Sequence, residues 1–524
     1  MTLTAGSAQN PRTEEGAPPR RTVVAPPGGS PGPQQRGGSR AAGPGPGLRP
    51  WRQAEAARAV LRRRYWATVP ARLRLLRAAT ILLAATLAVL LLVAGIAALG
   101  AWNSVADRDA PRTTSAADLN LALNDMDAQA ANVLLSSGDA GKGRLQTPYT
   151  KAVGFYGDAR REIGHDLRAL AVAAQGSRED EKTVESLTDD FAEYQELIGR
   201  ALENDGHRGG KPAALAGYRR ATDLLRNQLL PAARALVSSN DAAFDGEYSS
   251  ARSTASAQLA TVFALGVVLL AVLGVLQCYL ARSFRRFLNP GVLAATVCTL
   301  LAVVLGAQML SASADRLRGA RREAFDSVVA LSRARAIAYD ANADESRYLL
   351  DPQRRTQYED AFLAKSQQLY GLKGATASTY DPELATTWQA YEADHHDLRF
   401  TGEFRRELDN ITFSGERAAA EKAVDAYAVY QRDDRKIRAL LAAGKEREAV
   451  EFCMDWEPGT SNAHFGAWMA ALDKVAGINR AHFASSVRDG RSAVSGLLPW
   501  AAGLLAAAGL LTLLGLRPRL AEFR

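Results

Sequence analysis

Four long runs of uncharged, mostly apolar residues constrain the fold of this chain more than any other feature. None of them contains Asp, Glu, Lys or Arg, and they cover residues 78–100, 258–280, 291–310 and 493–516. At about 1.5 Å per residue, such runs form helices of roughly 30–36 Å, which matches the hydrocarbon core of a bilayer. Because backbone polar groups must be satisfied internally in lipid, each run is expected to be a transmembrane helix. A soluble enzyme is therefore not the simplest interpretation.

The distribution of charge predicts how the four helices are oriented. The chain has a formal net charge of +8, but residues 1–77, 281–290 and 517–524 together carry +16, which leaves −8 for the rest. An excess of Lys and Arg marks the cytosolic side of a membrane protein. We therefore expect a multi-pass cell-membrane protein with both termini in the cytosol. One local conflict is a group of arginines that follows the third run on the opposite side: Arg316, Arg318, Arg321 and Arg322.

The segments between the runs differ in composition. Residues 1–50 hold 10 of the 21 Pro and 10 of the 43 Gly, so they cannot bury a core and are expected to be disordered. Residues 51–77 read as a basic helix interrupted at Pro70, for which binding to anionic headgroups and ordinary positive flanking of a span both remain open. No nucleic-acid partner is expected, because no nucleic-acid fold signature accompanies these charges. The expected order is a disordered cytosolic arm (1–50), a basic juxtamembrane helix (51–77), the first span (78–100), a first extracytoplasmic bundle (101–257), the second span (258–280), a cytosolic link (281–290), the third span (291–310), a second extracytoplasmic bundle (311–492), the fourth span (493–516) and a cytosolic tail (517–524).

The two long segments outside the membrane have the pattern of helical bundles. Apolar residues recur at intervals of three and four, as amphipathic helices require. Turn-forming residues divide the first segment into four helices, expected at about 112–136, 148–174, 179–203 and 212–256. The outer two continue into spans. This predicts an all-α membrane protein in which two four-helix bundles stand in tandem on four transmembrane helices.

The second half of the chain repeats the first. Asp127-Ala128-Gln129-Ala130 matches Asp340-Ala341-Asn342-Ala343, and Phe191-Ala192-Glu193-Tyr194-Gln195 matches Tyr427-Ala428-Val429-Tyr430-Gln431. The matching order of spans and motifs favours an internal duplication over chance similarity between Ala-rich helices. The two motifs lie about 23 residues further apart in the second half than in the first, and we expect these extra residues in an irregular stretch at 374–415.

Signatures of chemistry are weak in this sequence. It has no glycine-rich phosphate loop, nucleophile elbow or HExxH motif, so we expect no enzyme and no cofactor. Uncharged spans argue against an ion pathway. Adjacent His395 and His396 would point to different sides of a helix, which favours a solvated turn over a metal site. Cys453 is the one cysteine outside the spans; a packed small residue is favoured, and a bridge across a homodimer remains open.

Two polar clusters in the second segment are candidates for a ligand or partner surface. In one of them, helical spacing places Asp340, Asp344 and Arg347 on one face, with Asn342 on another. The other is a turn at Pro458-Gly459 that breaks the last helix of the second segment. A simple kink with a capping Ser or Asn remains the alternative there. The candidate residues are Asp340, Asn342, Asp344, Arg347, Trp456, Glu457, Ser461 and Asn462.

A four-helix bundle between two spans resembles the sensory regions of bacterial chemoreceptors and sensor kinases. The segments from Ala338 to Asp351 and from Ala449 to Ala463 are similar to those of actinobacterial membrane proteins with tandem bundle sensor domains, the GlnX-type proteins. The resemblance covers about residues 75–516. It implies that the protein connects an amino-acid-binding lipoprotein outside with a soluble Ser/Thr protein kinase inside, the ligand being an acidic amino acid or its amide.

These patterns predict a non-enzymatic signal transducer. Eight residues follow the last run, so we expect the signal to leave through the N-terminal 77 residues, the 281–290 link or a partner. A structural scaffold and an accessory subunit of a transport system are the alternatives.

Overall fold

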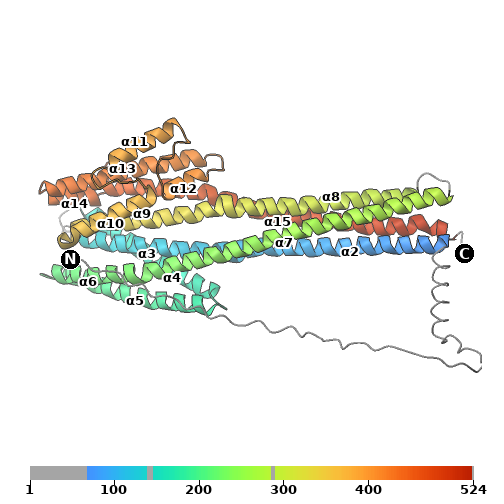
Figure 1. Cartoon of the computed structure of the whole chain (residues 1–524). Helices are drawn as coiled ribbons and strands as arrows, with labels where there is room; N and C mark the ends of the chain where they lie inside the picture. The colour runs from blue at the N-terminus through green and yellow to red at the C-terminus, as the bar shows by residue number, and fades with distance from the viewer. Residues whose placement is uncertain (1–67, 138–144, 285–288, 522–524) are drawn as a thin grey trace, which may run out of the picture. The chain divides into compact units, whose positions relative to one another are not determined.

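The fold consists of helices that run through the whole described part of the chain. This computed structural model describes residues 68–137, 145–284 and 289–521, and every regular element in these ranges is a helix. Four of the helices are long and apolar enough to cross a membrane. The predicted all-α membrane fold is therefore confirmed (Figure 1). The expected disordered arm, most of the basic segment and parts of the 281–290 link and the tail lie outside the described residues.

The helices follow one another in the order of the labels in Figure 1. Their bounds are α2 (Val69–Ser104), η1 (Val105–Asp109), α3 (Ala110–Ser137), α4 (Gln146–Ala173), α5 (Arg178–Gly206), α6 (Lys211–Leu224), η2 (Leu225–Leu229), α7 (Leu230–Phe284), α8 (Pro290–Arg318), η3 (Gly319–Phe325), α9 (Asp326–Leu350), η4 (Pro352–Arg354), α10 (Arg355–Leu369), α11 (Tyr380–Ala393), α12 (Glu403–Asp409), α13 (Glu416–Ala442), α14 (Glu446–Met454) and α15 (Ser461–Ala521).

Helix ends coincide with capping and turn residues. Pro70 stands in the first turn of α2, where its missing N–H is not needed. Asn289 caps α8, because its side-chain oxygen accepts hydrogen bonds from the N–H groups of Gly291 and Val292 at 3.0 and 3.3 Å. Gly459 has φ = 93° in the turn between α14 and α15, a conformation that favours glycine. The break predicted at Pro458-Gly459 is thus confirmed.

Four long helical segments join an apolar half to a bundle half. A π-helical turn lies at the junction in α2–η1–α3 and α8–η3–α9, whereas η2 lies within the bundle half of α6–η2–α7, and α15 continues as an α-helix. The turns η1 and η3 come at the same place in the two halves of the chain, just after the first and third apolar runs. The duplication seen in the motifs therefore extends to a backbone irregularity, and such turns often mark functional positions in helices.

The apolar halves pack around their own core. Leu87 and Leu91 of α2, Leu269 and Leu273 of α7 and Ala302 of α8 are among its fully buried members. Large apolar side chains on the opposite faces of the same helices are exposed, which suits contact with lipid. They include Leu82, Val89, Ile96, Phe263 and Val275.

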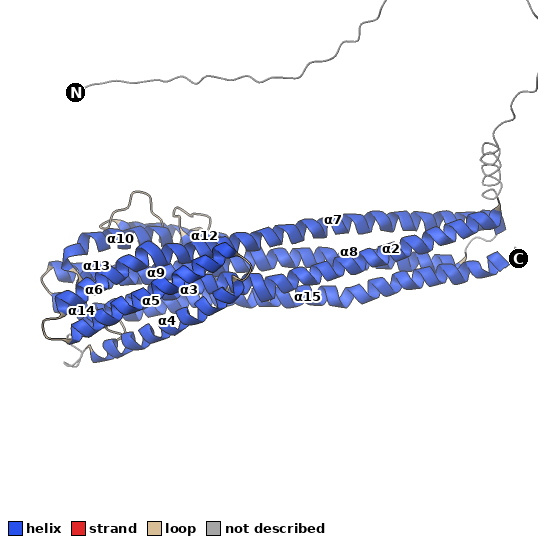
Figure 2. Ribbon diagram, turned by 90° about the horizontal axis from the view of Figure 1, so that it is seen from below, coloured by secondary structure: helices blue, strands red, loops and turns tan. Residues whose placement is uncertain are grey.

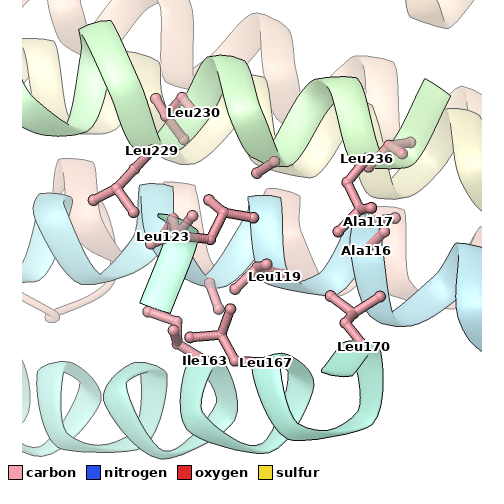
Figure 3. Packing of buried hydrophobic residues seen from close by; sticks show 14 of the residues in the cluster. Ala116, Ala117, Leu119, Leu123, Ile163, Leu167, Leu170, Leu229, Leu230 and Leu236 are labelled. Carbon is pink, nitrogen blue, oxygen red and sulfur yellow. The ribbon is translucent and has the colours of Figure 1, made fainter. Parts of the chain in front are cut away.

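The bundle halves share a long interface formed by α3 and α9. These two helices pack against each other and lie between the α4–α5 side and the α13–α14 side of the molecule (Figures 1 and 2). Within the first bundle, Leu119 and Leu123 of α3 lie between Leu167 of α4 and Leu230 of α7 (Figure 3). The same core continues into the second bundle through Phe325.

The second bundle carries additional helices. Its main helices are α9, α10, α13 and α15, and it buries an aromatic core that includes Tyr427, Tyr430 and Trp468. The stretch 374–415, expected to be irregular, contains the short helices α11 and α12. Both bury apolar and aromatic residues in this core, among them Tyr380, Trp388 and Phe404, so packing gives helical structure to a segment whose Gly and Thr content favours loops.

Acidic partners surround one of the arginines that conflicted with the predicted orientation. Arg321 is buried and lies 2.7 Å from Asp241 and 2.8 Å from Asp245 of α7. It also pairs with Asp326, and its guanidinium lies 4.7 Å from the centre of the Phe244 ring. This buried arginine therefore has a structural role in the bundle half, and it begins a long segment, in which positive charges have less influence on orientation.

Trp102 joins three helices near the point where apolar and bundle halves meet. Its indole N–H donates to Ser313 Oγ of α8 at 3.0 Å, and its ring lies against Gly490 of α15. The side chain is buried, so it is not available for contact with lipid, whereas Trp500 of α15 is 71% exposed.

Candidate functional site

The strongest concentration of buried charge lies where the two bundles meet. Six ionic side chains form what we call the interbundle ion cluster: Asp127, Arg226, Asp340, Asp344, Arg347 and Lys365. They come from α3, η2, α9 and α10, so both bundles contribute. Three are acidic and three basic, which leaves the cluster neutral.

Asp127 holds the first bundle together around its carboxylate. Tyr194 of α5 donates to Oδ1 at 2.8 Å, Thr222 of α6 donates to the same oxygen at 3.2 Å, and Tyr218 donates to Oδ2 at 3.3 Å. Arg347 of the second bundle completes the set as an ion pair. Side chains from three other helices thus converge on one fully buried carboxylate of α3.

Arg347 is the corresponding centre of the second bundle. Its side chain is 1% exposed and pairs with Asp344 one turn earlier in α9, as well as with Asp127. Tyr218 accepts a further hydrogen bond from Nε at 3.1 Å. A buried guanidinium is tolerated only when acceptors surround it, and these acceptors come from both bundles.

Cations from both sides surround the remaining carboxylates of the cluster. Lys365 Nζ lies 2.7 Å from Asp340 Oδ1 and also pairs with Asp344. Arg226 of the first bundle pairs with Asp344. Burial alone would raise the pKa of Asp340, but Lys365, Arg347 and Arg226 outweigh it and lower that pKa below its usual range. The carboxylate of Asp340 is therefore ionised at neutral pH.

Further ion pairs extend this contact along α6 and α9. Arg219 donates from Nε to Asp351 Oδ2 at 2.7 Å, and Asp223 lies 3.3 Å from Arg354. Together with Arg226, the first-bundle members stand at intervals of four and three residues, which places them on one face of the helix. Its partners in the second bundle are Asp344 within α9 and Asp351 and Arg354 just after its end.

A second polar cluster lies on another side of α9, inside the second bundle. Ser461 at the start of α15 donates to Glu345 Oε1 at 2.7 Å, and Cys453 Sγ lies 3.5 Å from the same oxygen. Asn342 donates to the Tyr430 hydroxyl at 3.4 Å. Burial of Glu345 and the nearby Asp434 raise its pKa to about 8, so this carboxyl is mostly protonated at neutral pH.

Burial also bears on the two interpretations of Cys453. Its sulfur lies in the interior beside Glu345, and burial raises the pKa of the thiol well above its usual value. A packed residue fits these surroundings, and a bridge to a second protomer would require them to open.

The turn that follows α14 connects the two bundles at their far end. Trp456 lies 5.6 Å from Phe155 of α4 between ring centres, and Lys151 Nζ lies 4.6 Å from its ring. Glu457 beside it is exposed. Asn462 is buried and donates to the main-chain oxygen of Met454, the last residue of α14, at 3.0 Å.

The eight predicted site residues thus do not form one open surface. The structure brings Asp340, Asp344 and Arg347 together on one face of α9, as their spacing predicted, but buries that face against the first bundle. Asn342 and Ser461 belong to the Glu345 cluster, Asn462 caps a helix end, and Trp456 bridges the bundles. Glu457 is the exposed member of the set. Whether any of the eight binds a ligand or a partner stays a prediction.

Sequence reasoning missed three members of the ion cluster, two from the first bundle and one from the second. Asp127 carried a signal, since it occupies the repeat position of Asp340, but was not selected. Arg226 and Lys365 carried none beyond the charge spacing on their helices, because an exposed helix face has the same spacing.

The arrangement is one of ion pairs and hydrogen bonds that satisfy each other. No group of three or more His, Cys, Asp or Glu residues in the described ranges could hold a metal ion. The ion cluster can therefore fix the relative position of the bundles. If α3 shifted against α9, these ion pairs would have to break and form again with other partners.

Comparison with known proteins gives one match. Neither curated proteins nor solved structures show a relative of this chain. Residues 101–249, which include α3, α4, α5, α6 and the bundle half of α7, match the family model described as an actinobacterial sensor domain. Together with the four apolar helices, this match supports a membrane protein with a sensing or signalling role, of the kind that actinobacterial sensor proteins have.

Proposed function

We propose that this protein is a transmembrane signal transducer that responds to an amino acid of the glutamate or aspartate type outside the cell membrane. A solute-binding lipoprotein brings the amino acid to the bundle end, and a cytosolic Ser/Thr protein kinase receives the signal. Both termini lie in the cytosol. The protein itself catalyses no reaction.

The observation that carries this proposal is the joining of α3 to α9 by the ion cluster. Each of the two helices continues through a π-helical turn into an apolar helix, so a displacement at the bundle interface has a direct route to the membrane. Asp127 and Arg347 must move together or exchange partners, because an unpaired buried charge costs several kcal/mol. A ligand or partner that favours one of two such arrangements shifts the population between them.

Support for the outside partner comes from the far end of the bundles. The turn with Glu457 is exposed there, and Trp456 beside it contacts α4 of the first bundle. A protein that docks on this turn would touch both bundles. The sensor-domain match over residues 101–249 and the resemblance to GlnX-type proteins favour a signalling partner at this position.

Photo-crosslinking in native membranes tests the partner. We replace Glu457 with benzoylphenylalanine and identify adducts by mass spectrometry, with and without L-glutamate. The expected adduct is a solute-binding lipoprotein whose yield changes at least threefold with L-glutamate. The control places the same probe at exposed Trp500 in an apolar half, where no such adduct should form. If the Glu457 probe captures no binding protein, the lipoprotein partner is excluded.

Deletion of residues 2–60 tests the cytosolic output. We expect the truncated protein to reach the membrane normally but to lose the L-glutamate-dependent change in Ser/Thr phosphorylation of cytosolic proteins, measured by quantitative phosphoproteomics. Long continuous helices also suit a rigid scaffold, which should tolerate the deletion. If phosphorylation and L-glutamate uptake are both unchanged, the scaffold is favoured. If phosphorylation is unchanged but L-glutamate uptake is lost, a transport accessory subunit is favoured.

A further inference from the structure

A cavity of about 220 Å³ lies between the two bundles, apart from the ion cluster. Helices α3 and α7 of the first bundle and α9 and α10 of the second supply its walls. Its polar lining consists of Asn120, Asn124, Arg234, Ser238, Arg333 and Gln368. No Asp or Glu among the described residues lines it. The lining therefore contains two arginines and no carboxylate.

Two buried amide oxygens of this lining have no partner. Asn120 is 7% and Asn124 2% exposed, and Oδ1 of each is buried without a hydrogen bond. The orientation of Asn124 is fixed, because its Nδ2 donates to the main-chain oxygen of Asn120 at 2.7 Å. A buried acceptor without a donor has lost its hydrogen bond to water without a replacement, which costs free energy. A ligand that brings N–H or O–H groups to these oxygens would recover that free energy.

The two arginines supply the positive end of the cavity. Arg234 makes no ion pair with any described residue, and the nearest carboxylate to Arg333 is Glu403 at 3.9 Å, beyond hydrogen-bond distance. Both side chains are exposed. A carboxylate is the ligand group that guanidinium binds best in a planar, two-point geometry.

The size and polarity of the cavity restrict the kind of ligand that it can hold. A volume of about 220 Å³ corresponds to roughly seven water molecules at about 30 Å³ each, which suits an organic molecule of a few heavy atoms. The rest of the wall is apolar and formed by Ala117, Val237, Val329, Ala336 and Ile337. A bulky ligand does not fit a cavity of this size.

We propose that this cavity binds a small carboxylate that carries an amino or hydroxyl donor on the carbon next to it. The carboxylate lies between Arg234 and Arg333, and the donor group faces Oδ1 of Asn120 and Asn124. Small α-amino acids and small α-hydroxy acids share this chemistry. Such a cavity gives the chain a direct ligand site between its bundles. Its consequence for signalling rests on the proposed sensing function.

Binding to the full chain tests the proposal. The protein is reconstituted in lipid nanodiscs without partners and titrated calorimetrically with L-glutamate, L-glutamine and L-serine as amino acids, L-lactate and L-malate as hydroxy acids, and acetate as a carboxylate without the donor. We expect saturable binding in one of the two arms and at least tenfold weaker binding of acetate. Absence of saturable binding in both arms overturns the proposal, as does acetate binding that equals the best ligand.

Variants of the exposed arginines locate the site. The double substitution Arg234→Met and Arg333→Met should weaken binding at least tenfold, with little effect on folding because both side chains lie at the surface. Arg178→Met, at another exposed arginine on α5, is the matched control and should bind as the unchanged protein does. Unchanged affinity in the double variant overturns the site.

A further variant tests the donor contact. Asn120→Asp places a carboxylate at the same position and should strengthen binding of an amino acid at least threefold relative to a hydroxy acid, since only the ammonium gains an ionic partner. A ratio that does not change contradicts the assigned orientation. These measurements need no partner protein. Failure of binding with intact crosslinking at Glu457 would therefore reject the direct site alone, and the opposite result would reject the lipoprotein partner alone.

Discussion

At the residue scale, the interface between the bundles depends on the ion pair of Arg347 and Asp127, in which each buried charge neutralises the other. Neither side chain is exposed, and they come from helices more than two hundred residues apart in the sequence. Removal of one partner from such a pair is costly, because the other stays behind as a buried charge, whereas replacing both with apolar groups can be nearly neutral.

We expect Arg347→Met to lower the free energy of unfolding by about 3–5 kcal/mol, measured by urea denaturation in detergent with tryptophan fluorescence. Arg354→Met is the matched control. Arg354 also pairs across the bundles, with Asp223, but both side chains are partly exposed, so the loss should stay below about 1 kcal/mol. The double substitution Asp127→Asn and Arg347→Met should recover part of the loss. Equal effects of the two arginine variants would contradict the assigned role.

Because of Glu345, we expect the stability of the folded protein to depend on pH with a definite sign. Its pKa is about 8 in the folded protein, against an ordinary value of 4.5. Between these values the folded state holds a proton that the unfolded state has lost, so this group's contribution to stability is complete below about pH 4.5 and falls as the pH rises through 8.

Glu345→Gln should therefore change the thermal midpoint little at pH 5 and raise it relative to the unchanged protein at pH 8. Gln can still accept the hydrogen bond from Ser461. Glu448→Gln, at an exposed glutamate paired with Lys445, is the control and should show no such trend. A difference between Glu345→Gln and the unchanged protein that is constant from pH 5 to pH 8 would refute the assignment.

At the scale of elements, the connection between apolar and bundle halves depends on close helix contact. A Cβ atom at Gly490 of α15 would lie 2.2 Å from the ring of Trp102. That ring has little freedom to move away, because it is buried and bound to Ser313. The two π-helical turns η1 and η3 lie in the neighbouring connections, so a change here acts on the segment through which α3 and α9 reach their apolar helices.

Gly490→Ala should destabilise the protein by about 1–3 kcal/mol, as overpacking of a buried contact does. Gly496→Ala lies in the same helix with open space around its Cβ position. It should be neutral or stabilise by up to about 1 kcal/mol, because alanine is the better helix former. Thermal melts of both variants in the same detergent check this, and the idea fails if the two substitutions have the same effect.

At the scale of the whole described unit, the two bundles form a continuous interior. The core of the first includes Phe325 and Val329 of the second, and Asn132 accepts a hydrogen bond from Ser346 at 2.6 Å across the interface. Separation would expose the α3 face that packs on α9 and would leave Asp127 without Arg347. The sensor-domain match ends at residue 249, but the interior that stabilises this segment does not.

Separate expression of residues 105–256 and 315–492 tests this continuity. We expect the first fragment to unfold without a sharp transition on its own, and to gain a cooperative transition and a one-to-one complex when the second is added, followed by circular dichroism and analytical ultracentrifugation. Asp127→Asn should stabilise the first fragment alone, since it removes a charge that has lost its partner. A first fragment that is monomeric, cooperative and unaffected by the second would show that the bundles are independent.

The sequence by itself determined the features that depend on neighbouring positions along the chain. Long uncharged runs are enough to predict membrane helices, because the requirement for an apolar helix in lipid does not depend on which helices pack together. The periodicity of three and four gave the four helices of the first bundle to within a few residues, and the Pro-Gly pair gave the break before α15. The duplication was visible because motifs kept their order.

Only the tertiary structure decided which helix faces meet. The face with Asp340, Asp344 and Arg347 looks like a solvated or ligand-binding face in the sequence, since its counter-charges lie in other helices, more than one hundred residues away for Arg226 and Asp127. The cavity with Asn120 and Arg333 likewise joins residues of both bundles. Burial of a charge depends on the partner that packs against it, and that partner is set by the packing of the whole chain rather than by any local pattern.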